Sequence, residues 1–186
     1  RALTTEEVQR LEAHCAEAKR APLRLLAMVR LALDLGLRVG EIAKLEIGDF
    51  DWRAGTVTLK RTKSQRQDVL PLPVLTGQAL AEYMRHERPA TTLPSLFVRR
   101  LAPHDKPIGV DAVSQAIGRA LRGAGISRGC HSLRHTLACR LVNSGSSIKE
   151  VADVLRHRSL DTSLIYAKLD LQLLAEVALP WPGSAS

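Results

Sequence analysis

Residues 22–36 read PLRLLAMVRLALDLG, and this stretch decides the fold. Its apolar side chains would cover nearly every side of a helix, as they do in a helix that is surrounded by other elements. Pro22 suits the first turn of such a helix, and Gly36 suits the position just after its end. We therefore expect a central core helix here, within a mainly helical (α+β) domain.

Most of the remaining chain also has helical patterns. Thr4 stands three residues before Glu7, which is the spacing of a capping box at the start of a helix. Two runs rich in β-forming residues, 56–60 and 68–72, flank a polar connector and predict one small antiparallel β-sheet, with Pro71 indicating an edge strand. Further helices are predicted at residues 39–45, 74–87, 111–123, 132–144, 147–156, 159–166 and 170–179.

The composition favours a nucleic acid as partner. Twenty-seven basic and 19 acidic residues give a formal net charge of +8, which favours polyanions, nucleic acid first and a membrane surface second. No apolar run approaches the length of a membrane span, so we expect no membrane role. Three cysteines without CxxC spacing favour a cytoplasmic setting, in association with the nucleoid if the protein is bacterial.

Basic residues are concentrated in two windows that contain no acidic residue, 53–67 and 112–149. Any single basic residue can belong to an ordinary solvated surface. Two such windows in one small domain nevertheless favour a phosphate-binding face. The basic residues of the windows are Arg53, Lys60, Arg61, Lys63 and Arg66, followed by Arg119, Arg122, Arg128, Arg134, Arg140 and Lys149.

The stretch CHSLRH at 130–135 places His131 and His135 four residues apart, with Arg134 between them. On a helix this spacing is typical of zinc ligands. A zinc site also needs a third ligand, but the window around the stretch has no carboxylate, and His157 lies between two arginines. We therefore expect no metal here. Arginine with histidine suits a phosphate, and purely structural histidines remain the alternative.

Four segments, in this order, resemble the catalytic domain of the tyrosine recombinase (phage integrase) family, and together they cover nearly the whole chain. They are LGLRVGEIAKL at 35–45, LKRTKSQRQDVLPL at 59–72, HSLRH at 131–135 and VLRHRSLDTSLIYAKLD at 154–170. The chain departs from the family at Arg156, where the family often has glycine. The resemblance implies the same fold class, a helical catalytic core with one small sheet.

The resemblance also implies a catalytic set and its chemistry. Tyr166 would attack a DNA phosphodiester and form a 3′-phosphotyrosyl bond, without a metal or other cofactor. Arg38, Arg134 and His157 would bind the non-bridging oxygens. His131 would take the tyrosine proton, and Lys63 would protonate the departing 5′ oxygen, although a simple phosphate contact is the alternative for Lys63. The implied set is Arg38, Lys63, His131, Arg134, His157 and Tyr166.

Further residues have supporting or neutral roles in this interpretation. Glu41 would orient an active-site group, with a plain surface residue as the alternative. His135 would support the site, with a packed structural histidine as the alternative. Arg61 and Arg66 would contact the DNA backbone without reading its sequence. The second tyrosine, Tyr83, lies among apolar residues of a predicted helix, and we expect it in the core.

The chain is thus expected to be a site-specific recombinase or integrase that acts on a double-stranded DNA site. We expect a homo-tetramer on DNA, and a monomer when the protein is isolated is compatible with this expectation. Residues 1–179 would form the catalytic domain, with 180–186 a flexible tail and the family's N-terminal core-binding domain absent. Segment 170–179 would dock into a neighbouring protomer or fold back onto its own domain. The alternatives are a DNA-binding module with inactive or incomplete catalysis and a strand-relaxing enzyme like type IB topoisomerases.

Overall fold

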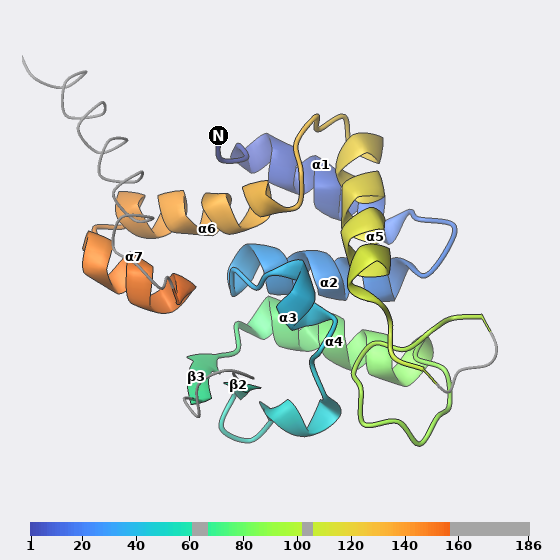
Figure 1. Ribbon diagram of the computed structural model, residues 1–186. Coiled ribbons are helices and arrows are strands. Elements are labelled where there is room, and N and C mark those ends of the chain that lie inside the picture. Colours follow the sequence, from blue (N-terminus) through green and yellow to red (C-terminus); the bar gives the residue numbers. More distant parts are fainter. Residues whose placement is uncertain (61–66, 102–105, 157–186) are drawn as a thin grey trace, which may run out of the picture. The chain divides into compact units, whose positions relative to one another are not determined.

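The computed structural model describes residues 1–60, 67–101 and 106–156 (Figure 1). The chain divides into a compact unit of residues 1–137 and a second unit that begins at Ala138. The described helices are α1 (Thr5–Ala16), α2 (Pro22–Asp34), α3 (Val39–Ile42), α4 (Val74–His86), α5 (Val110–Gly123), α6 (His131–Asn143) and α7 (Ile148–Leu155). The strands are β1 (Phe50–Asp51), β2 (Thr56–Lys60) and β3 (Gln67–Pro71), preceded by a 3₁₀ turn at Ile47–Asp49. The predicted fold class, a mainly helical domain with one small antiparallel sheet, is confirmed.

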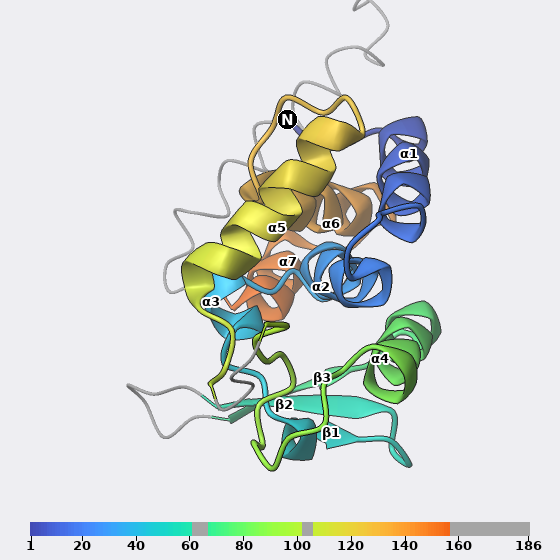
Figure 2. The same cartoon turned by 90° about the vertical axis from the view of Figure 1, so that its right-hand side faces the viewer.

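Helix α2 is the centre of the first unit. It packs against α1, α3, α4 and α5, and Figure 2 shows it between α1 and α4. Its side chains Met28, Leu31 and Leu33 are fully buried. Gly36 follows the end of the helix with φ 59°, a left-handed conformation that glycine adopts without steric cost. The prediction of a central helix closed by this glycine is confirmed.

The sheet is a three-stranded antiparallel meander in the order β1-β2-β3. In the β2–β3 pair, Thr56 lies opposite Pro71 and Lys60 lies opposite Gln67. The predicted hairpin is therefore confirmed, and β3 is an edge strand, as Pro71 indicated. Strand β1 was not predicted, because two residues are too few to produce a period-2 pattern.

The segment between α4 and α5 contributes to the core, although its prolines and glycine predicted only a connection. Leu96 and Phe97 are fully buried, and the backbone N–H of Leu96 donates to the carbonyl of Leu45 at 2.8 Å. This pairing explains why α3 is shorter than the predicted helix 39–45, since Leu45 bonds to another segment. Tyr83 is fully buried with its ring centroid 5.2 Å from that of Phe97, which confirms its prediction as a core residue.

The second unit contains the end of α6 and helix α7. A capping box between Ser147 and Glu150 begins α7, and Arg156 ends it in a left-handed conformation with φ 54°. The predicted helices 159–166 and 170–179 lie outside the described residues. Among the helices that the structure describes, none combines the length and the apolar character needed to span a membrane.

Candidate active site

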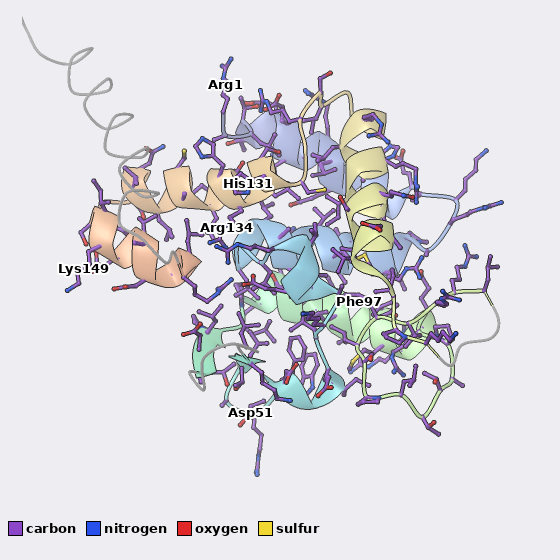
Figure 3. The ribbon with its side chains drawn as sticks, viewed as in Figure 1. Arg1, Asp51, Phe97, His131, Arg134 and Lys149 are labelled. Carbon is purple, nitrogen blue, oxygen red and sulfur yellow. The ribbon has the colours of Figure 1, made fainter. Side chains whose placement is uncertain are left out.

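The turn that follows α2 holds a buried arginine of α6. The side chain of Arg134 is almost fully buried, and its guanidinium Nη1 donates a hydrogen bond to the backbone carbonyl of Gly36. Figure 3 shows the Arg134 side chain reaching from α6 toward the turn between α2 and α3, with His131 at the first turn of α6. The backbone that precedes Arg38 therefore fixes the orientation of the Arg134 guanidinium.

Arg38 stands at the N-cap of α3, where Glu41 holds it in two ways. One carboxylate oxygen of Glu41 accepts the backbone N–H of Arg38 at 2.8 Å. The other accepts Nη1 of the Arg38 side chain at 3.2 Å. The Arg38 side chain is 47% exposed, so this guanidinium is fixed at its base and still reachable from solvent. The carboxylate of Glu41 thus sets the direction in which the arginine points.

The start of α6 is tied to two other parts of the first unit. The thiol of Cys130 donates to the carbonyl of Ser114 in α5 at 3.3 Å. The hydroxyl oxygen of Thr136 accepts the backbone N–H of Leu3 at 2.8 Å. These contacts hold the exposed His131 at the first residue of α6.

His135 lies one helical turn after His131 and is half-buried. Burial is the main cause that lowers the pKa of His135, and the nearby His131 lowers it further. A lowered pKa favours the neutral imidazole, in which one ring nitrogen donates and the other accepts a hydrogen bond. Such a group can hold a neighbour in place without adding a positive charge.

Folding brings acidic side chains from other parts of the chain next to some basic residues of the two windows. The ammonium of Lys60 lies 2.9 Å from the carboxylate of Asp49 and 3.1 Å from that of Glu46. These carboxylates, Asp49 first, raise the pKa of Lys60. In the second window, Arg128 lies 2.8 Å from Glu7 of α1. The acids come from outside the windows, so two of the basic side chains are already neutralised by folding.

The structure describes half of the sequence-predicted catalytic set. Arg38 and Arg134 are linked through the Gly36 turn, and His131 lies on the same helix as Arg134. The remaining predicted residues, Lys63, His157 and Tyr166 with the DNA contacts Arg61 and Arg66, lie outside the described residues. No group of three His, Cys, Asp or Glu side chains that could hold a metal occurs in the part of the chain that the structure describes.

Three supporting contacts were not predicted from the sequence. They are the hydrogen bond from Arg134 to the carbonyl of Gly36, the hydrogen bond from the N–H of Leu3 to the hydroxyl of Thr136, and the ion pair of Lys60 with Asp49. Gly36 was visible as a helix-ending glycine, but the partner of its carbonyl is 98 residues away. Contacts between such distant residues leave no local signal in one sequence.

Comparisons with known proteins agree with this fold. The model of the phage integrase family matches residues 1–172. The protein y4rA of Sinorhizobium fredii, a predicted integrase/recombinase, is 37% identical over the whole chain, which spans 46% of y4rA. Tyrosine recombinase XerA of Pyrococcus furiosus is 29% identical over 95% of the chain and 60% of that protein. The chain thus spans only part of the length of these relatives.

A solved structure is similar over nearly the whole chain. It is the XerH site-specific recombinase in a post-cleavage complex with its palindromic difH substrate. The two share a TM-score of 0.79 and 25% identity, over 97% of this chain and 53% of the XerH chain.

Proposed function

Because the chain belongs to the phage integrase family, we propose that it cleaves and rejoins DNA strands as a site-specific recombinase, through a 3′-phosphotyrosyl bond on Tyr166. One observation carries this proposal most directly. Arg134 is buried and bonded to Gly36, in the turn that leads to Arg38. A buried, oriented guanidinium on the turn that leads to a second, accessible arginine supplies the kind of donors that suit a phosphate.

The two arginines supply the charge that the transition state requires. When the oxygen of Tyr166 attacks phosphorus, negative charge gathers on the non-bridging oxygens. Arg38 and Arg134 bind these oxygens in our proposal, and His157 donates a further hydrogen bond. Because the donors are oriented before the reaction begins, little reorganisation is needed as the charge develops.

Two proton transfers accompany the exchange of bonds. The phenol of tyrosine has an ordinary pKa near 10, so its proton must be accepted as the new P–O bond forms. We assign this step to His131, which lies exposed at the start of α6. The P–O5′ bond breaks in the same step, and the ammonium of Lys63 gives its proton to the 5′ oxygen. The products are a phosphotyrosyl bond and a free 5′ hydroxyl.

The phosphotyrosyl bond keeps the energy of the original phosphodiester. A 5′ hydroxyl from a second DNA strand can therefore attack it and release the tyrosine, which completes a strand exchange. Tyr166 supplies the nucleophile, and the other assigned groups donate or accept protons and hydrogen bonds, so we propose that the reaction requires neither a metal ion nor a nucleotide.

The partner that we propose is a double-stranded DNA site bound by four copies of the protein. The relative XerH was solved in complex with its DNA substrate, which supports DNA as the partner. We assign residues 1–179 to the catalytic domain and segment 170–179 to docking between protomers. Relaxation of supercoiled DNA uses the same chemistry and is the second candidate, favoured by the same arginine pair.

The proposal is tested by trapping the covalent intermediate. Nicked duplexes with random-sequence arms are incubated with the protein in EDTA, and DNA that stays attached under denaturing conditions is recovered, sequenced and used as substrate. Tyr166→Phe should abolish the adduct and leave DNA binding unchanged. Tyr83→Phe is the matched control, because it removes the same hydroxyl from a core residue and should retain the adduct.

Each outcome separates two candidates. If no adduct forms with any duplex, the chain is a DNA-binding module. If EDTA alone prevents the adduct, the reaction requires a metal. If supercoiled plasmid is relaxed and two sites are not recombined, the enzyme is a strand-relaxing one.

A further inference from the structure

Three residues at the beginning of the chain lie against the start of α6, and each of them is held. The carbonyl of Ala2 accepts a hydrogen bond from Nη1 of Arg128 at 2.9 Å. The backbone N–H of Leu3 donates to the hydroxyl of Thr136, and the side chain of Leu3 is buried in the core. Thr4 is the N-cap of α1 and takes part in its capping box. We call these three residues the strap.

Thr136 is the residue of α6 that binds the strap. Its side chain is almost fully buried. The hydroxyl donates to the carbonyl of Ser132, one helical turn earlier, at 2.8 Å, and it accepts the N–H of Leu3 at the same distance. A hydroxyl has one proton to donate, so the bond to Ser132 leaves its lone pairs for Leu3. Without this hydroxyl, the N–H of Leu3 would lose its acceptor in a buried place.

Arg134 holds the start of α6 from the other side. Its guanidinium donates to the carbonyl of Gly36, in the turn that leads to Arg38. Successive residues of an α-helix are rotated by roughly 100° about its axis, so Arg134 and Thr136, two positions apart, point in nearly opposite directions. Contacts on opposite sides of a helix fix its rotation about its own axis, which one contact alone does not. His131, three residues before Arg134, shares the face of Arg134 and rotates with it.

We propose that Thr136 is a positioning residue for DNA cleavage. By binding the strap, it fixes the rotation of the start of α6, and this rotation sets where Arg134 and His131 meet the phosphate. Small misplacements of such groups cost large factors in rate, even when they originate away from the reacting atoms. The inference rests on the proposed function, since it requires Arg134 to bind the phosphate and His131 to take the tyrosine proton.

Three substitutions separate positioning from stability. Thr136→Val keeps the shape of the side chain and removes the acceptor of the Leu3 N–H. Thr136→Ser keeps the hydroxyl and is the conservative variant. Thr76→Val is the matched control, because Thr76 is also a fully buried threonine whose hydroxyl donates a hydrogen bond, at 2.7 Å to Asp34. That bond joins α4 to α2 and involves no residue of α6.

The single-turnover rate of adduct formation on the nicked duplex recovered in the covalent assay measures the positioning. Thr136→Val should slow this step by about tenfold or more, because a misplaced catalytic group loses rate steeply. Its affinity for DNA should stay unchanged, and Thr136→Ser should restore most of the rate. Thr76→Val should keep the full rate, although urea unfolding should show that it loses stability as Thr136→Val does. Circular dichroism shows that each variant is folded under the conditions of the assay.

Amide hydrogen exchange reports on the strap without any DNA. In Thr136→Val, the N–H of Leu3 and the amides at the start of α6 should exchange at least about tenfold faster, since exchange follows local opening. In Thr76→Val and Thr136→Ser, the exchange at Leu3 should stay close to that of the unaltered protein. This measurement is independent of the reaction that we propose.

Three results overturn the inference, and they differ. If exchange at Leu3 rises in Thr136→Val and cleavage keeps its full rate, the strap holds α6 without positioning the site. If Thr136→Val and Thr76→Val lose rate equally, or the rate falls without faster exchange at Leu3, the loss does not come from the strap. If the unaltered protein forms no adduct with any duplex, the proposed function fails, and the role of Thr136 in cleavage fails with it.

Discussion

The guanidinium of Arg134 donates to the carbonyl of Gly36, and a single residue separates this glycine from Arg38. Two arginines that are 96 positions apart in sequence are therefore set by one turn of backbone. The conformation of that turn, with φ 59° at Gly36, presents the carbonyl that orients the Arg134 guanidinium and leads the backbone to Arg38, whose side chain Glu41 then orients. Changes in the turn should alter the site without touching either arginine.

Arg134→Lys should reduce cleavage more than it reduces DNA binding. Lysine keeps the positive charge but has no planar fork, so it cannot bond to Gly36 and to a phosphate in the same geometry. Loss of one oriented donor typically costs about 10²–10³ in rate. The formation of covalent adduct over time measures this effect.

Arg140→Lys is the matched control for that variant, because Arg140 is an exposed residue of the same helix. It should leave the rate of adduct formation unchanged. Full activity of Arg134→Lys would show that positive charge alone is sufficient, and an equal loss in both variants would show that the loss does not come from the anchored geometry of Arg134.

Gly36→Ala and Gly40→Ala form a second pair, and their effects should have opposite signs. Alanine at Gly36 must adopt the left-handed conformation at a cost of about 1–2 kcal/mol. At Gly40, in α3, an added β-carbon meets nothing within 4 Å, and alanine should stabilise the protein by about 0.4–1 kcal/mol. Urea unfolding measures both, and an equal midpoint for the two variants would contradict the role of the turn.

The sequence predicted the elements far better than it predicted the contacts between them. Helix α2 and the β2–β3 hairpin follow from local patterns of apolar, β-forming and turn residues, so they could be located in advance. The burial of Leu96 and Phe97 could not, because that segment has no regular period and its partner Leu45 is distant. Likewise, the motif predicted Arg134 as a site residue, but it did not predict the hydrogen bond from Arg134 to Gly36.

Arg156 offers a test of backbone strain. It ends α7 with φ 54°, at the position where the resemblance led us to expect glycine. Arg156→Ala and Arg156→Gly both remove the guanidinium, so their comparison isolates the backbone. The glycine variant should be the more stable by about 1 kcal/mol, because alanine pays the left-handed cost. In an ordinary helical conformation, alanine is more stable than glycine. A more stable alanine variant would therefore contradict the left-handed conformation of residue 156.

Acid should weaken the link between α1 and the residues before α6. The backbone N–H of Thr4, chiefly, and the nearby Arg128 lower the pKa of Glu7 below its ordinary value of 4.5. A lowered pKa means that the stabilisation is complete above pH 4.5 and is lost as the pH falls through the folded-state value. Glu7→Gln should therefore flatten the dependence of stability on pH below 4.5.

Chemical unfolding at a series of pH values measures this slope. Glu17→Gln, at the other end of α1, serves as the control. The same slope in Glu7→Gln and the unaltered protein would show that this carboxylate contributes nothing to acid unfolding.

The ion pairs of Lys60 and Arg128 also bear on how binding responds to salt. Each phosphate that a basic side chain neutralises releases condensed counterions and steepens the logarithmic salt dependence by about 0.9. Lys60 and Arg128 are already paired with Asp49 and Glu7, so we expect them to neutralise no phosphate and to release no counterions from DNA. Lys60→Met should leave the slope unchanged, whereas Arg119→Met, at an exposed position of α5, should make it shallower. The formal charge of the chain thus overstates the number of counterions that binding of the protein releases from DNA.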